Sequence, residues 1–156
     1  MNKKHLINQL ILELKANHNT AITAAKRAHN TATDKANIAE NKYDTLGLEA
    51  AYLAEGQSKR VMSLQEDLAC FKNLDIKHYN EDMEIDLGAL ICLSSENTSS
   101  QYLFISPVAG GTVVPYQHIN ITLITLSSPL GRALKNSMLG DDIQLHSALY
   151  EIKAIW

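Results

Sequence analysis

The sequence predicts an α+β protein: an N-terminal antiparallel coiled-coil hairpin of two long helices, then a C-terminal antiparallel β domain with one short helix. No proline precedes Pro107, and only two of the seven glycines precede Gly88, so helix breakers gather late in the 156-residue chain. Apolar residues repeat at heptad spacing in the first half and in short, turn-separated runs in the second. We therefore expect a helical hairpin over 1–74, a linker over 75–86 and a separate domain over 87–156.

Two heptad seams predict the hairpin, because small or apolar residues recur at alternating steps of four and three. The first seam runs from bulky residues to alanines and the second from alanines to bulky residues, so an antiparallel fold-back matches them by size. In that register the numbers of facing residues add to 82, which centres the turn near Asn41. The first seam is Ile7, Ile11, Leu14, His18, Ala21, Ala25, Ala28 and Ala32, and the second is Ala50, Ala54, Gln57, Val61, Leu64, Leu68 and Phe71.

The seams imply an arm about 45–50 Å long, with its tip near residues 34–46. The paired seams satisfy each other within one chain, which favours a monomer. A plain bundle with a third helix is disfavoured, because no later segment has a comparable amphipathic pattern. His18, on the seam, is expected to be a partly buried, hydrogen-bonded structural residue rather than a ligand.

The second half reads as about five strands packed on one helix. A polar, acidic stretch over 73–86 precedes it, and Ala109-Gly110-Gly111 reads as a turn rather than a nucleotide cradle. Ser128 offers an N-cap with Pro129 at the first helical position, and Gly140 is expected to end that helix. The expected strands are Leu87–Leu93, Gln101–Ile105, Asn120–Leu126, Ile143–His146 and Leu149–Ile155.

Charge and composition exclude several classes of protein. The net charge is −3, with +2 on residues 1–74 and −5 on 75–156, which disfavours a strongly basic nucleic-acid binder. The first residues do not resemble a signal peptide, and no run approaches the roughly 18 apolar residues of a membrane span. Cys70 and Cys92 lack metal or redox spacing, so a reduced, cytoplasmic protein is expected, although a single disulfide stays open.

Catalytic motifs are absent, since the sequence has no HExxH, CxxC, GxSxG or phosphate-binding loop. Asp82, Glu84 and Asp86 alternate, and a solvated linker explains them better than a cation site.

The predicted tip brings polar groups together. If helix continues through it, Asn37, Glu40 and Asp44 share one face, and the two carboxylates offer oxygen ligands to a Mg²⁺ ion that a partner also holds. On spacing alone, however, a cap on the second helix by Asn41 or Asp44 is favoured.

Two separate segments resemble the Gre-type bacterial transcription elongation factors. Residues 36–41 (ANIAEN) followed by Tyr43 are similar to the family's tip motif, Gly-Asp-Leu-x-Glu-Asn with a tyrosine soon after. Residues 124–134 (ITLSSPLGRAL) and Gly140-Asp141-Asp142 are similar to the C-terminal signature of Ser-Pro, a short helix and a Gly-Asp turn. Gly88-Ala89-Leu90-Ile91 and Gln101-Tyr102 also match the family's opening strands, and residues 40–57 resemble a shorter, divergent branch.

The resemblance implies an FKBP-like fold for the C-terminal domain. It also implies that this domain docks at the rim of the RNA polymerase secondary channel while the coiled coil enters the channel. In the family, two tip carboxylates help to hold the second Mg²⁺ of the polymerase and promote cleavage of backtracked RNA, so contact with the nascent RNA 3′ end is implied. Such a factor has no intrinsic cofactor and no turnover of its own.

The tip motif departs from the family at its first acidic position. Glu40 occupies the second acidic position, but the first is the neutral Asn37, and the tyrosine comes one residue early. Asp34 and Asp44 lie close by but outside the motif positions. Polymerase binding is therefore predicted more firmly than stimulation of cleavage, and a competitor for the channel without cleavage activity stays open.

Other functions also stay open. A prolyl isomerase needs an apolar, largely aromatic pocket, and the aromatic residues beyond Asp75 show no cluster in sequence. A structural or chaperone-like hairpin that binds another protein is a third class. The residues expected near a partner surface are Ser128, Pro129, Leu130 and Arg132 on the domain and Lys26 and Arg27 on the arm, where the basic pair contacts RNA, the channel wall or only solvent.

Overall fold

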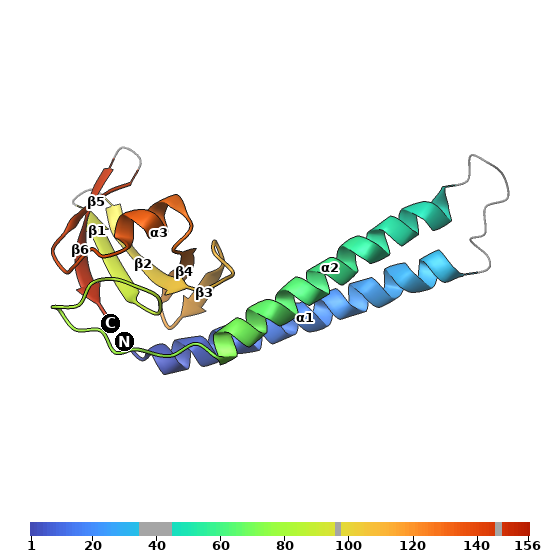
Figure 1. Cartoon of the computed structure of the whole chain (residues 1–156), viewed down its shortest axis with the longest axis horizontal. Coiled ribbons are helices and arrows are strands. Elements are labelled where there is room, and N and C mark those ends of the chain that lie inside the picture. The colour runs from blue at the N-terminus through green and yellow to red at the C-terminus, as the bar shows by residue number, and fades with distance from the viewer. Residues whose placement is uncertain (35–44, 96–97, 146–147) are drawn as a thin grey trace. The chain divides into compact units, whose positions relative to one another are not determined.

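The computed structural model describes residues 1–34, 45–95, 98–145 and 148–156 (Figure 1). It confirms the predicted α+β class, with long helices first and a sheet with one short helix after them. In the described residues no helix is long and apolar enough to cross a bilayer. The elements are α1 (Lys3–Thr33), α2 (Leu46–Lys72), β1 (Leu90–Ser95), β2 (Thr98–Ser106), β3 (Val113–Tyr116), β4 (Ile119–Thr125), α3 (Pro129–Leu134), β5 (Asp142–Leu145) and β6 (Ala148–Ile155).

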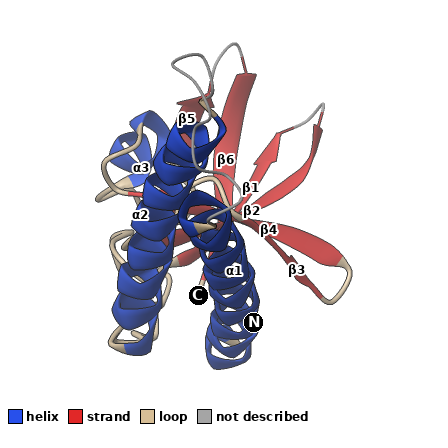
Figure 2. Cartoon of the chain, turned by 90° about the vertical axis from the view of Figure 1, so that its right-hand side faces the viewer, coloured by secondary structure: helices blue, strands red, loops and turns tan. Residues whose placement is uncertain are grey.

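Helices α1 and α2 contain 31 and 27 residues and run side by side (Figure 2). Every residue of both predicted seams is buried or half-buried. Between Ala50 and Phe71, Asp67 is the one residue off the seam that is not exposed. The burial pattern therefore confirms the two seams, while the pairing of individual residues across them stays a prediction. The predicted turn centre, Asn41, lies outside the described residues.

The chain forms two compact units, one of residues Met1–Leu10 with Cys70–Trp156 and one of Ile11–Ala69. The predicted boundaries at 74 and 87 do not coincide with them, because residues 75–86 belong to the first unit. Ile85, an apolar residue in that polar stretch, is fully buried in the core of the domain. Its N–H donates to the Ser137 carbonyl at 2.8 Å, and its own carbonyl accepts from Asn136 N–H at 2.9 Å.

The sheet has six strands in the order β3-β4-β2-β1-β6-β5. Its β2–β4 pair is parallel, as in Tyr102 opposite Ile121, so the sheet is mixed rather than purely antiparallel as expected. The extra strand, β3, lies at the edge of the sheet and pairs antiparallel with β4. After β3 the chain turns back, so β4 lies between β3 and β2 and runs in the same direction as β2. Sequence patterns missed β3 because Pro115 interrupts its four residues, and proline is tolerated at a sheet edge.

Helix α3 packs on this sheet through Leu134, which is fully buried. Gly131 makes the close approach possible, since a Cβ there would lie 2.0 Å from the Thr125 carbonyl oxygen. The helix ends at Leu134 with Lys135 as its C-cap, so the predicted end at Gly140 is wrong. The backbone of Lys135 is already extended, with ψ of 132°, and Asn136 follows with a left-handed φ of 64°, so neither residue continues the helix.

Residues 109–111 form the predicted turn after β2. The Thr112 N–H donates to the Ala109 carbonyl at 3.2 Å, and Ala109 and Gly111 both have positive φ. A backbone in this conformation closes a tight turn, as the sequence predicts. Both cysteines are free, Cys70 exposed and Cys92 buried.

Candidate functional site

The predicted tip lies almost wholly outside the described residues. Asn37, Glu40, Asn41, Tyr43 and Asp44 all fall in 35–44, so their predicted roles, including the metal pair Glu40 and Asp44, stay predictions. Among the described residues no group of three or more His, Cys, Asp or Glu side chains could hold a metal ion.

The two helix ends that lead into the tip are described. Asp34 follows the last residue of α1 and is exposed. Thr45 precedes α2, its carbonyl accepts from Glu49 N–H at 2.8 Å, and its hydroxyl donates to the Glu49 carboxylate at 2.7 Å. A carboxylate in the first turn also faces the positive end of the helix dipole. Thr45 and Glu49 therefore hold the first turn of α2 together.

The Ser-Pro signature folds as a capped helix start. The Ser128 hydroxyl accepts from Gly131 N–H at 3.0 Å and donates to the Thr125 carbonyl at 2.8 Å, with Pro129 at the beginning of α3. These contacts confirm the predicted cap and are worth about 1 kcal/mol. Pro129 is exposed, whereas Leu130 is half-buried and packs against the core.

Arg132 is exposed, and its guanidinium donates to the Ser127 carbonyl. This hydrogen bond fixes a cation on the surface of α3 beside the exposed Pro129. Of the four residues predicted near a partner surface, the structure therefore exposes Pro129 and Arg132 and gives Ser128 and Leu130 structural contacts.

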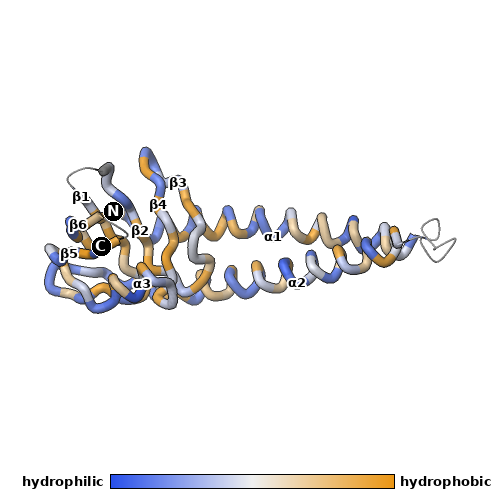
Figure 3. Tube along the Cα trace, turned by 90° about the horizontal axis from the view of Figure 1, so that it is seen from above, coloured by the Kyte–Doolittle hydropathy of each residue, from blue (hydrophilic) through white to orange (hydrophobic). Residues whose placement is uncertain are grey.

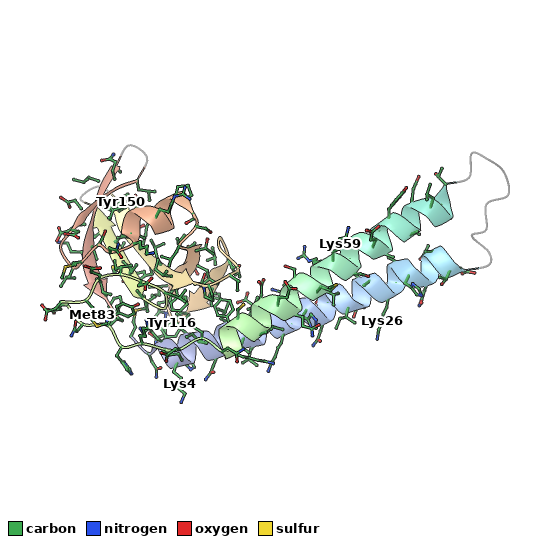
Figure 4. All side chains as sticks on the ribbon, in the orientation of Figure 1. Lys4, Lys26, Lys59, Met83, Tyr116 and Tyr150 are labelled. Carbon is green, nitrogen blue, oxygen red and sulfur yellow. The ribbon has the colours of Figure 1, made fainter. Side chains whose placement is uncertain are left out.

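The basic pair on the arm, Lys26 and Arg27, is exposed on α1. Lys26 projects from the side of α1 that faces away from α2 (Figure 4). In the described part of the chain neither side chain has a salt bridge, since the two ion pairs there are Lys59–Glu55 and Lys153–Glu151. Both side chains are therefore accessible, and their contact with RNA or a channel wall stays a prediction.

The sequence did not predict a lysine buried between the start of α1 and the residues that precede the sheet. Lys3 is 5% exposed, and its Nζ donates to the carbonyls of Lys77 and Gly88, the latter at 3.1 Å. The same Nζ lies 4.7 Å from the centre of the Tyr79 ring, a cation–π geometry. One feature of the sequence could have indicated this burial. Lys3 lies four residues before Ile7, so it occupies the position that the first seam would reach if it were extended toward the N-terminus.

Burial determines the titration of both partners. It lowers the pKa of Lys3 to about 8, because the charged amine loses water. Burial also raises the pKa of Tyr79, with the Asp86 carboxylate adding to the effect. The Tyr79 hydroxyl donates to the Leu87 carbonyl at 2.9 Å, so this ring is held from both sides.

A second aromatic contact attaches the same end of α1. Tyr116, at the end of β3, donates to the Asn2 carbonyl at 3.4 Å, and its ring meets that of His5 edge to face at 5.8 Å. Asn2 also lines an open pocket of about 820 Å³, together with residues that include Leu74, His78 and Trp156. Residues 1–10 therefore belong physically to the β domain, although they begin the long helix.

His18 is expected to be partly buried and hydrogen-bonded, and one of its ring nitrogens differs from this expectation. Its Nε2 is buried and has no hydrogen-bond partner among the described residues, so the predicted hydrogen bond is not found there. Gln9 Oε1, also on α1, is unpartnered in the same way. A buried polar atom that stays without a partner costs about 1–3 kcal/mol.

The solved structures that are similar to this chain include three of Gfh1. The first is the crystal structure of GreA factor homolog 1 (Gfh1) of Thermus thermophilus, at 20% identity and a TM-score of 0.41, covering 97% of this chain and 93% of that one. A structure of the transcription factor Gfh1 has 17% identity, a TM-score of 0.39 and covers 93% and 92%. Thermus aquaticus Gfh1 has 17% identity, a TM-score of 0.36 and covers 92% and 91%.

No family model and no curated protein matches the chain. At these identities and TM-scores the likeness is a similarity of overall layout and does not assign a function. The functional conclusion therefore depends on the motifs and on the geometry of the described residues.

Proposed function

We propose that the chain binds bacterial RNA polymerase, places the end of the α1–α2 hairpin in the secondary channel and modulates elongation or transcript cleavage. It acts as a single chain without turnover of its own. The observation that supports this most is the pairing of two long helices along buried seams, which carries the described helix ends at Asp34 and Thr45 far from Ile11 and Ala69 within their unit.

The dimensions of the hairpin suit such a role. The 27 residues of α2 span about 40 Å at 1.5 Å per residue. Most buried apolar residues of the two helices lie along the seams, and the exposed positions are mostly polar, with some large apolar side chains such as Leu12 and Met62 among them. Figure 3 shows hydrophilic and hydrophobic residues alternating along both helices. A hairpin of this length with mostly polar exposed positions can lie in a water-filled channel.

The tip chemistry completes the proposal. Glu40 and Asp44 are the carboxylates that we propose to share a Mg²⁺ ion with the polymerase, next to the RNA 3′ end. Two protein carboxylates are sufficient when the partner supplies the remaining ligands. The first acidic position of the motif is the neutral Asn37 in this chain. We therefore propose that the unsubstituted chain occupies the channel of the polymerase and stimulates cleavage only weakly.

The docking surface is proposed to include Pro129 and Arg132. An arginine whose guanidinium is already fixed by the Ser127 carbonyl loses little conformational entropy when it meets a carboxylate on a partner. We expect Arg132→Ala to weaken binding to purified bacterial core polymerase about 10-fold, a loss of roughly 1.4 kcal/mol. Fluorescence anisotropy of the labelled chain measures this directly.

The matched control is Lys153→Ala, which removes one exposed positive charge from β6 of the same domain. We expect it to bind like the chain without substitutions. Circular dichroism checks that both variants fold. No binding of the unsubstituted chain to core polymerase would contradict the proposal, and equal losses in the two variants would remove Arg132 from the docking surface.

A further inference from the structure

The face of α2 opposite the seam carries a second heptad pattern. Each of its members lies two residues before a seam residue, which rotates it by about 200° from the seam. All of them are exposed, and the three large apolar ones, Leu48, Tyr52 and Met62, are 55%, 67% and 62% exposed. We call this face the outer stripe and define it as Leu48, Tyr52, Glu55, Lys59, Met62 and Glu66.

Single exposed apolar residues are common on protein surfaces and need no partner. The outer stripe differs because it is complementary to itself when a second copy of it runs antiparallel. When the numbers of facing residues add to 114, Tyr52 meets Met62 and Glu55 meets Lys59. Leu48 then meets the aliphatic stem of Glu66. A twofold axis produces every one of these pairs twice.

We propose that a second copy of this chain docks antiparallel on the outer stripe and forms a weak symmetric dimer. The charges select this arrangement. Lys59 Nζ lies 2.7 Å from Glu55 Oε1 within one chain, and the two side chains are 74% and 62% exposed. Figure 4 places Lys59 on the side of α2 away from α1, where a partner can reach it. In the dimer each Lys59 gains a second carboxylate, the Glu55 of the other copy.

The alternative parallel arrangement is disfavoured by the same residues. It would place Glu55 opposite Glu55 and Lys59 opposite Lys59, and like charges at facing positions are destabilising. The charge order along the stripe therefore determines both the partner and its direction.

The size of the contact predicts its strength. From Leu48 to Glu66 the stripe is about 27 Å long and offers three large apolar side chains per copy. Stable interfaces bury roughly 1,200–2,000 Å², and we expect a contact along one helix face to bury less than this. We therefore expect a dissociation constant of about 100 µM to 1 mM. The sequence-based expectation of a monomer considered the seams alone, and it still holds for the dilute chain. The dimer does not depend on polymerase binding.

Sedimentation velocity between about 10 µM and 1 mM tests the proposal. The unsubstituted chain should shift from monomer toward dimer, whereas Glu55→Lys alone and Lys59→Glu alone should stay monomeric because each sets like charges opposite one another. An equimolar mixture of these two variants should associate again, since each copy then meets its opposite charge. Glu13→Lys, the same charge change on an exposed position of α1, should dimerise normally.

A monomeric unsubstituted chain at every concentration would overturn the proposal. So would a mixture of the two charge variants that fails to associate, or Glu55→Lys that dimerises like the unsubstituted chain. Circular dichroism confirms that each variant keeps its helices, which we expect because Glu55 and Lys59 are both exposed.

Disulfide trapping tests the direction of the dimer. In a Cys70→Ser background, the double variant Tyr52→Cys with Met62→Cys should form covalent dimers on oxidation. Tyr52→Cys alone should not, because the two copies of position 52 would be about 15 Å apart in the antiparallel register. Efficient cross-linking of Tyr52→Cys alone, or none in the double variant, would overturn the antiparallel arrangement.

Discussion

Gly131 lies in α3, where the helix passes over the end of β4. Its N–H is bound by the Ser128 hydroxyl, and a Cβ would lie 2.0 Å from the Thr125 carbonyl oxygen and 2.8 Å from the Thr125 carbonyl carbon. These are backbone atoms of a paired strand, so they cannot move aside as a flexible side chain can. The absence of a side chain at one position thus lets the helix sit on the sheet.

We expect Gly131→Ala to lower the free energy of unfolding by about 3 kcal/mol or more, because the extra methyl forces α3 away from the strand. Urea unfolding followed by circular dichroism measures it. The matched control is Gly56→Ala in α2, where an added Cβ would meet nothing within 4 Å. That change should stabilise the chain by up to about 1 kcal/mol through helix propensity. Similar effects at the two glycines would contradict the packing argument.

The buried amine of Lys3 predicts a pH dependence of stability. Burial lowers its pKa from 10.5 to about 8, so between these values the unfolded chain binds more protons than the folded one. The free energy of unfolding should therefore rise with pH from about 8 to 10.5, by no more than about 2 kcal/mol given partial solvent screening. A neutral amine still has two N–H groups for the carbonyls of Lys77 and Gly88.

Lys3→Met tests this by keeping the aliphatic stem and removing the amine. Its stability should lack the rise with pH, whereas Lys4→Met, at the exposed neighbouring position, should keep it. Urea unfolding at several pH values measures the slope for each variant. Equal slopes in the unsubstituted chain and Lys3→Met would show that other groups cause the dependence.

Among the elements, the helical hairpin owes its stability to the seam and little to its other faces. Leu14 on the seam is 3% exposed, whereas Leu12, two residues earlier on α1, is 65% exposed. The same substitution at the two positions therefore separates burial from helix propensity.

We expect Leu14→Ala to lower the free energy of unfolding by about 2–4 kcal/mol and Leu12→Ala to change it by less than about 0.5 kcal/mol. Thermal melts monitored at the helical circular dichroism band distinguish them. A loss at Leu12 as large as the loss at Leu14 would mean that the outer face of α1 is covered in solution.

The hairpin could be predicted from sequence because its burial follows a local period. A seam of 3.5-residue spacing needs no knowledge of distant residues, and the cap at Ser128 and Pro129 is equally local. The sheet order could not be predicted in the same way. The parallel β2–β4 pairing depends on the position of β3 at the edge of the sheet. That strand is not recognisable from the sequence pattern, because it contains Pro115.

The same distinction applies to the candidate site. Ile85 and Lys3 each break the polarity of their surroundings, one apolar in an acidic stretch and one charged on a seam. Their hydrogen-bond partners lie far along the chain. Ile85 bonds to Ser137 and Asn136, and Lys3 bonds to Gly88. A local sequence pattern shows that such a residue is unusual but does not identify its partner. For this reason the sequence predicts residues 75–86 as a linker, whereas the structure places them in the first compact unit.

At the scale of the whole molecule, the proposed function separates binding from cleavage. The exposed cation of Arg132 is proposed to act in docking, and the carboxylates at residues 34–46 are proposed to act on the metal. A substitution in the tip should therefore change transcript cleavage without changing affinity for polymerase.

Asn37→Asp restores the first acidic position of the tip motif. In a backtracked bacterial elongation complex we expect it to raise the rate of transcript cleavage at least about 10-fold over the unsubstituted chain, since a carboxylate binds Mg²⁺ more strongly than an amide. Asn30→Asp, which adds the same charge at an exposed position of α1, should leave the rate unchanged. Adding Glu40→Gln to Asn37→Asp should abolish the gain, because the gain requires a carboxylate at both acidic positions of the tip motif. Retained binding with no gain in cleavage would show that Asn37 is not what limits cleavage.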